Sequence, residues 1–232
     1  MPRPRAFDER QVLGRAREQF WATGYAGTRM DDIAQATGLG KGSLYGAFGD
    51  KGKLFHRVFG DWCTAVVEVA EGRLAGGPDA EALVRLSGYV HLMAENTASD
   101  SERRGCLLAK GVAELAQHDP TVAGRSAETM TALLTLLRTE ISAAQRHGDI
   151  DSTADPERLA ALLLTVVRGI EAVGKAGLAP ETLRTIADTA LAVLPMPEGR
   201  KRLATGLSHG PDTGDRATTS PSPASPRRPL RS

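Results

Sequence analysis

The stretch from Met30 to Ala47, MDDIAQATGLGKGSLYGA, constrains the fold of this chain more than any other segment. Its small and apolar residues fall where two short helices must cross around a tight turn. Ala34 is small at the expected helix contact, and Gly38 can adopt the left-handed conformation that turns the chain. The apolar residues that can fill the shared core are Ile33, Leu39 and Leu44. The pattern predicts a helix-turn-helix whose second helix enters the major groove of DNA.

Residues on both sides of this motif predict further helices. Apolar residues recur at helical spacing between Asp8 and Thr23, and Gly24 is a stop signal. Thr28, followed three residues later by Asp31, resembles a capping box at the start of the motif. Asp50 can cap a longer helix whose apolar period continues for about five turns. We therefore expect three short helices followed by one long helix.

The second helix of the motif has two distinct faces. Leu44 and Phe48 lie four residues apart and therefore share the inner face. The residues left on or near the outer face, where DNA would lie, are Ser43, Tyr45, Gly46 and Ala47.

This segment resembles the amino-terminal signature of the TetR-type transcriptional regulators. The residues that carry the resemblance are Thr28, Ile33, Ala34, Gly38, the run Lys41 to Tyr45, Phe48, Lys51 and the pair Leu54 and Phe55. The resemblance is specific from Val12 to Phe59, and the run Gly105 to Leu108 resembles one recurring branch of the family. It implies a second, all-helical domain that binds a ligand.

The resemblance also implies which residues contact DNA. They are Thr28, Lys41, Ser43, Tyr45 and Lys51. Lys51 can add its ammonium to helix-terminal amides that face a phosphate, Tyr45 can donate to a phosphate oxygen, and Lys41 can reach a phosphate or guanine acceptors. Gly42 and Gly46 complete the predicted surface. Gly46 stands where many members carry a large residue, so we expect little base readout from it.

The charge of the chain is segregated along the sequence. Residues 1–57 carry a net charge of +4, residues 58–196 carry −7 and residues 197–232 carry +4, although the whole chain carries only +1. A basic amino-terminal part on an acidic body suits a protein that docks one end on phosphates. Many aliphatic residues and only 4% aromatic residues favour packed helices.

The acidic middle predicts a second helical domain. Apolar stripes predict helices over residues 79–95, 106–117, 121–147, 155–175 and 180–194. We expect these helices and the long helix after Asp50 to surround a ligand cavity. The candidate cavity residues, chosen from apolar helix faces, are Trp62, Val66, Tyr89, Met93, Leu108 and Met130.

The stripes of residues 155–194 exceed what one chain needs to cover its own core. They predict a two-fold homodimer interface in the form of a four-helix bundle, with one larger monomer core as the alternative. The complete fold prediction is all-α. It places a three-helix helix-turn-helix DNA-binding domain at residues 1–49, a helical ligand-binding and dimerisation domain at 50–195, and a disordered tail rich in Pro, Ser and Arg at 196–232.

Two cysteines in a chain without a signal-peptide pattern argue against a disulfide. Cys63 is expected to pack as a small apolar residue. Cys106 follows Arg103 and Arg104 at an expected helix start, and both features favour its thiolate. A redox- or electrophile-sensing role for Cys106 therefore stays open beside ordinary packing.

The predicted function is ligand-responsive transcriptional regulation. A homodimer would bind double-stranded DNA at a palindromic operator, and an unknown small molecule would release it. We expect no catalytic residues, no cofactor and no metal, since the histidines lack ligand spacing and the glycines around Lys41 lack the Ser or Thr of a phosphate loop. We also expect a cytoplasmic protein without membrane contact. The alternatives of other classes are an all-helical enzyme and a protein-interaction module.

Overall fold

A computed structural model describes residues 7–197 of the chain. Its elements are α1 (Glu9–Gly27), α2 (Met30–Thr37), α3 (Lys41–Phe48), α4 (Lys51–Leu74), the 3-10 turn η1 (Asp79–Glu81), α5 (Ala82–Ala98), α6 (Leu107–Leu115), α7 (Pro120–His147), α8 (Pro156–Lys175) and α9 (Pro180–Ala192). The described part contains no strand, so the prediction of an all-α fold is confirmed. The predicted tail lies outside the described residues from residue 198 onward.

Local signals set the ends of the first four helices much as predicted. Asp8 caps α1 by accepting from the backbone N–H of Arg10 at 2.9 Å. The helix is interrupted at Gly24, whose φ of 78° breaks the regular spiral. Gly38 ends α2 in the left-handed conformation with a φ of 71°. Asp50 caps α4 through the N–H of Lys53 at 2.8 Å.

The predicted capping box between Thr28 and Asp31 is wrong by one residue. The carboxylate that reaches back belongs to Asp32, whose Oδ2 accepts from the N–H of Arg29 at 2.8 Å. Arg29 is the residue in extended conformation before α2. Thr28 instead belongs to the end of α1, where its hydroxyl donates to the carbonyl of Gly24 at 2.7 Å.

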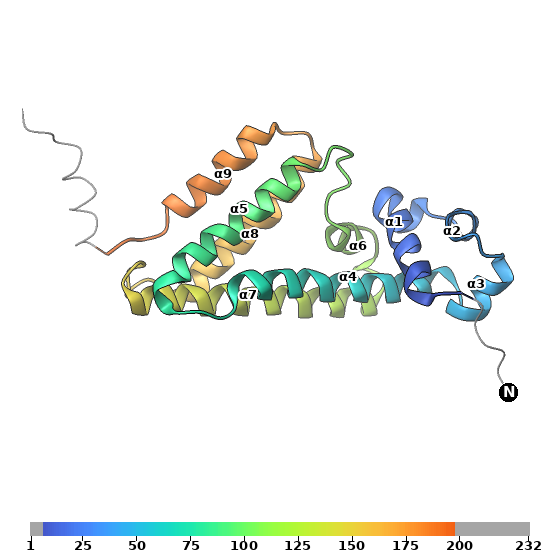
Figure 1. Ribbon diagram of the computed structural model, residues 1–232, viewed down its shortest axis with the longest axis horizontal. Helices are drawn as coiled ribbons and strands as arrows, with labels where there is room; N and C mark the ends of the chain where they lie inside the picture. The colour runs from blue at the N-terminus through green and yellow to red at the C-terminus, as the bar shows by residue number, and fades with distance from the viewer. Residues whose placement is uncertain (1–6, 198–232) are drawn as a thin grey trace, which may run out of the picture. The chain divides into compact units, whose positions relative to one another are not determined.

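Two clusters of buried apolar residues hold the described helices together. The first joins α1, α2 and α3 to the amino-terminal half of α4, to α6 and to the start of α7. The second joins the remainder of α4 to α5, α7, α8 and α9. Figure 1 shows α4 and α7 running side by side, with α5 and α8 inclined to them and α9 packed on that pair. The core of the amino-terminal helices therefore continues into α4 without a gap.

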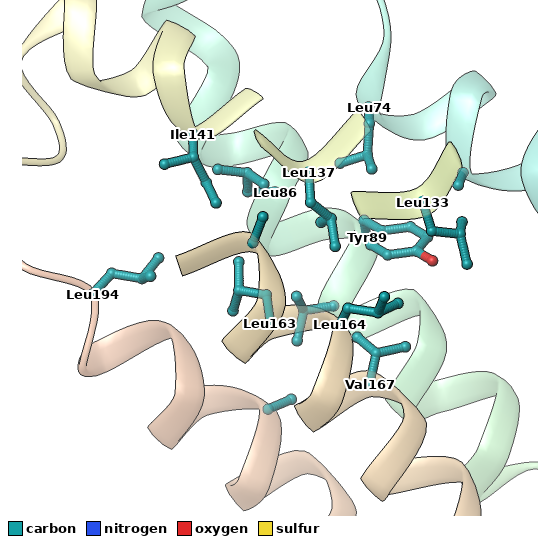
Figure 2. Packing of buried hydrophobic residues seen from close by; sticks show 14 of the residues in the cluster. Leu74, Leu86, Tyr89, Leu133, Leu137, Ile141, Leu163, Leu164, Val167 and Leu194 are labelled. Atoms are coloured by element: carbon teal, nitrogen blue, oxygen red, sulfur yellow. The ribbon is translucent and has the colours of Figure 1, made fainter. Parts of the chain in front are cut away.

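The second cluster fills the space where α4, α5, α7, α8 and α9 meet, and Figure 2 shows part of it. Leu74 from α4, Leu86 and Tyr89 from α5, and Leu137 from α7 are all at most 1% exposed. Leu163 from α8 lies in the same cluster (Figure 2). Each helix thus buries an apolar stripe against the others, as the sequence periodicity predicts.

The predicted dimerisation stripes divide between two faces. On α8, Leu163, Val167 and Ile170 are fully buried and belong to the core of the single chain. Leu162 points the other way and is 42% exposed. Much of the apolar surface assigned to a two-fold interface therefore lies inside the protomer. Fewer apolar residues of α8 face outward than the sequence pattern predicts.

Candidate DNA-binding surface and ligand cavity

The outer face of α3 is exposed and carries two glycines. Lys41, Gly42, Ser43, Tyr45 and Gly46 are all exposed, and the Tyr45 side chain retains 50% of its accessible surface. A Cβ atom added at Gly42 or at Gly46 would meet nothing within 4 Å. The backbone of this helix can therefore approach a groove closely, and Tyr45 projects from it as the largest side chain.

Lys41 is held to α2 by an exposed ion pair with Asp31. Both side chains are more than half exposed, at 58% and 59%. Pairs of this kind contribute little, typically below about 1 kcal/mol, because water screens them. The ammonium of Lys41 can consequently exchange Asp31 for a phosphate at small cost.

Thr28 and Lys51 are placed differently from the expectation that they contact DNA with their side chains. Thr28 is 1% exposed, and its hydroxyl is occupied by the carbonyl of Gly24. The ammonium of Lys51 donates to the carbonyls of Tyr25 and Thr28, both at 3.1 Å, and lies 4.2 Å from the centre of the Tyr25 ring. Both side chains fasten the end of α1 to the start of α4.

A cavity of about 530 Å³ lies among α1, α4, α5, α8 and the loop of residues 99–106. Four residues singled out from the sequence line it, namely Trp62, Val66, Met93 and Cys106. Three others, Tyr89, Leu108 and Met130, are not among its lining residues. Tyr89 and Leu108 are at most 1% exposed and serve the two apolar cores instead.

The charged residues of this cavity were not among those predicted from the sequence. Arg168 and Glu171 on α8 form an ion pair at 3.0 Å, with side chains that are 18% and 14% exposed. Burial raises the pKa of Glu171, and Arg168 opposes that shift. A signal was present in the sequence, because Arg168 follows Leu164 by four residues and so interrupts an apolar stripe.

Cys106 lies on the cavity wall just before α6 and is 9% exposed. The expected activation of its thiol is not found. Burial raises the pKa of Cys106, Glu171 raises it further, and Arg168, whose Nη1 lies 3.9 Å from Sγ, offsets only part of the shift. Arg104 does not serve the thiol, because it lies 3.8 Å from the centre of the Trp21 ring and pairs with Glu18 at 2.9 Å.

The cavity is directly linked to α1. Trp21 of α1 lines it, and its indole N–H donates to the carbonyl of Gly105. The ring centre of Trp21 lies 4.9 Å from that of Trp62 on α4. Helix α6, which follows the cavity loop, also contacts the end of α1. Lys110 donates to the carbonyl of Ala22 at 3.3 Å, and Glu114 accepts from the N–H of Ala26 at 2.8 Å.

Comparison with known protein families identifies both halves of this arrangement. The family model for bacterial regulatory proteins of the tetR family matches residues 12–58, which include α2, α3 and the exposed face just described. The model for the tetracyclin repressor-like C-terminal domain matches residues 82–189, which include the wall of the cavity that α5 and α8 provide. The chain belongs to the TetR family of transcriptional regulators. It is thus a DNA-binding regulator and not an enzyme.

The sequences of individual relatives align with this TetR-family regulator along most of its length. It is 25% identical over 193 residues to the HTH-type transcriptional repressor ComR of Escherichia coli (strain K12), covering 83% of this chain and 91% of ComR. It is 26% identical over 185 residues to the repressor BdcR of the same organism, covering 78% of this chain and 86% of BdcR.

The similarity extends to a solved complex with DNA. A cysteine-substituted variant of the TetR family regulator CifR, complexed with a 26-bp double-strand operator, superposes with a TM-score of 0.72 at 27% identity. The match covers 84% of this chain and all of the CifR chain.

Residues 7–197 contain no group of three or more His, Cys, Asp and Glu side chains placed to hold a metal ion. None of the helices in that range is long and apolar enough to cross a membrane.

Proposed function

We propose that this TetR-family regulator is a homodimeric repressor that acts in the cytoplasm and is released from a palindromic operator by a small molecule. The observation that carries the proposal is the combination of an exposed, polar α3 face with a cavity that shares Trp21 with the same amino-terminal helices. The names of ComR and BdcR, both repressors, and the operator complex of CifR support the same conclusion.

Docking on DNA follows from the shape and chemistry of α3. Ser43 and Tyr45 offer hydroxyl groups, and Lys41 offers a cation, along a face kept low by Gly42 and Gly46. We assign direct contacts with bases or phosphates to these five residues. Thr28 and Lys51 act behind them by holding α1 against α4.

A second copy is expected on the outward faces of α8 and α9. Besides Leu162, the outward surface of α8 presents small residues at helical spacing, of which Ala161, Thr165 and Ala172 are exposed and Gly169 is partly exposed. A Cβ atom at Gly169 would meet nothing within 4 Å, so this face has room for a neighbouring helix. A dimer formed here would present two α3 helices to successive major grooves, roughly 34 to 36 Å apart.

Ligand control is proposed to act through the contacts of the cavity with α1. A molecule that fills the cavity must press on Trp62 and on the loop that carries Gly105, and both touch Trp21. Displacement of α1 would then change the distance between the two α3 helices. Both half-sites must engage together, so a small misfit weakens binding; a coupling of about 1 to 3 kcal/mol between the two sites is typical.

The test is a mobility shift on the DNA upstream of the protein's own gene at several salt concentrations. Lys41→Ala and Tyr45→Phe are expected to weaken the specific complex several-fold and to leave the dimer intact. Arg73→Ala, which removes an exposed cation of α4 outside the proposed surface, is the matched control and should bind like the wild type. Unchanged affinity in both α3 variants would contradict the assigned face.

A further inference from the structure

The lining of the cavity indicates which class of ligand it accepts, provided that the protein is the ligand-controlled regulator proposed above. The lining residues fall into two chemical groups according to the elements that supply them. Apolar side chains come from α1, α4 and α5, namely Trp21, Trp62, Val66, Val69 and Met93. The charged side chains come from the loop of residues 99–106 and from α8. A volume of about 530 Å³ falls in the range of roughly 300 to 1,000 Å³ of small-molecule sites.

Three buried N–H donors of this lining form no hydrogen bond within the described part of the chain. They are Nε1 of Trp62, Nε of Arg168 and Nε of Arg104, the last of which lies 3.2 Å from Oε2 of Glu102 in an ion pair. Leaving such a donor unpaired costs about 1 to 3 kcal/mol, so an acceptor brought by a ligand gains more here than it would in water. Oε2 of Glu171 also lacks a well-aligned hydrogen bond, but it is already compensated by its ion pair with Arg168.

The lining of the cavity has more positively than negatively charged side chains. Four cations, Arg103, Arg104, Arg168 and Lys175, face two carboxylates, Asp100 and Glu171. Arg168 pairs with Glu171 at 3.0 Å and Arg104 pairs with Glu18 at 2.9 Å, which leaves Arg103 and Lys175 against Asp100, whose Oδ2 accepts from the backbone N–H of Gly105 at 2.8 Å. The site therefore carries an excess of positive charge.

Arg103 and Lys175 lie where the loop meets the end of α8. A Cβ atom at Gly177 would lie 2.7 Å from Nη1 of Arg103, and one at Gly105 would lie 2.8 Å from Cδ of Lys175, so each cation crosses to the backbone of the other segment. Arg103 holds a φ of 51°, which is unusual for a residue other than glycine. Neither cation has an ion-pair partner within residues 7–197. Lys175 also helps to lower the pKa of Lys110, after the effect of burial.

We propose that the cavity binds a small organic carboxylate whose apolar body lies against Trp62, Val66 and Met93 and whose carboxylate is held by Arg103 and Lys175. An oxygen of the same molecule accepts from the free N–H of Trp62 or Arg168. The apolar group supplies burial, and the carboxylate supplies the negative charge that this lining lacks.

Binding can be measured on the unmodified protein, because the only two tryptophans of the chain, Trp21 and Trp62, both line the cavity. The probes are 3-phenylpropanoate and octanoate, each compared with its uncharged primary amide. Titration of the intrinsic fluorescence, checked by calorimetry, should give about tenfold or more tighter binding for each acid than for its amide. Equal affinity of acid and amide, or no response to any of the four compounds, would overturn the proposal.

Variants locate the charge that selects the acid. Arg103→Gln and Lys175→Gln should each weaken the two acids several-fold and leave the amides unchanged, whereas Arg73→Gln, outside the cavity, should change neither. Equal losses for acids and amides would overturn the assigned roles.

Operator binding by the wild-type protein without any probe is measured separately. If it is absent, the proposed function fails whatever the fluorescence reports; if it is present, a negative titration counts only against the ligand class.

Discussion

At the scale of single residues, Thr28 belongs to the predicted DNA-binding signature, and its buried side chain bonds within the protein. Its hydroxyl donates to the carbonyl of Gly24, where α1 is interrupted, and its side chain is buried. The carbonyl of Thr28 in turn accepts from Lys51. Thr28 therefore connects the interruption of α1 to the start of α4. Replacing its side chain should lower the free energy of unfolding before it affects DNA binding.

Thr28→Val is expected to lower the free energy of unfolding by about 1 kcal/mol, because it removes a buried donor and leaves the Gly24 carbonyl without it. Thr28→Ser keeps the hydroxyl and should lose less. Urea unfolding followed by circular dichroism measures both. A Thr28→Val protein as stable as the wild type but weaker on its operator would instead support a direct contact with DNA.

The raised pKa of Cys106 predicts that its thiol reacts slowly at neutral pH. Since burial raises its pKa, its thiolate should form at higher pH than the thiolate of a free cysteine. At pH 7 it should therefore react with iodoacetamide more slowly than glutathione does. The measurement uses Cys63→Ala, so that a single thiol remains. A rate at pH 7 above that of glutathione would favour the electrophile-sensing role.

At the scale of elements, the helices with local signals could be predicted from the sequence and the cavity could not. Gly38, Asp50 and Pro156 mark helix ends through their own backbone or side-chain chemistry, so neighbouring residues suffice to place them. The cavity brings Trp21 to Gly105 and Arg168 to Cys106, contacts that join distant parts of the chain. Apolar periodicity places a residue on an inner face, but it does not distinguish a core position such as Tyr89 from a cavity wall.

The turn between α2 and α3 gives an element-scale prediction. Gly38→Ala should destabilise the fold by about 1 kcal/mol, because the φ of 71° is unfavourable for alanine. The added Cβ would meet no neighbour, so no steric clash contributes. Gly72→Ala is the matched substitution inside α4, also in open space, and should stabilise by up to about 1 kcal/mol. Thermal unfolding compares the two. A shift of the same sign in both variants would contradict the left-handed turn.

At the scale of the whole molecule, the proposed function needs two chains. The described protomer buries its main apolar stripes internally, which leaves the outward face of α8 for a partner. The amino-terminal helices share one apolar cluster with the first half of α4, with α6 and with the start of α7, and the rest of α4 shares the other with α5, α7, α8 and α9. In the proposed mechanism, a shift of one cluster against the other is transmitted to the amino-terminal helices through α4.

Leu162→Glu should weaken the dimer by about two orders of magnitude, since it places a charge in the centre of the proposed interface. Val84→Glu is the control, because Val84 is even more exposed, at 70%, and lies on α5. Analytical ultracentrifugation measures the association of both variants. If Leu162→Glu remained dimeric while Val84→Glu dissociated, the interface would lie on a different face.

The most direct measurement is a titration of the wild-type protein onto a labelled fragment from upstream of its own gene and onto a shuffled fragment of the same composition, at moderate salt. The predicted result is saturation at two chains per operator, with an affinity about 10³-fold or more above that for the shuffled fragment. Equal affinity for both fragments, or saturation by a single chain, would contradict a dimeric regulator that docks its two α3 helices on one palindrome.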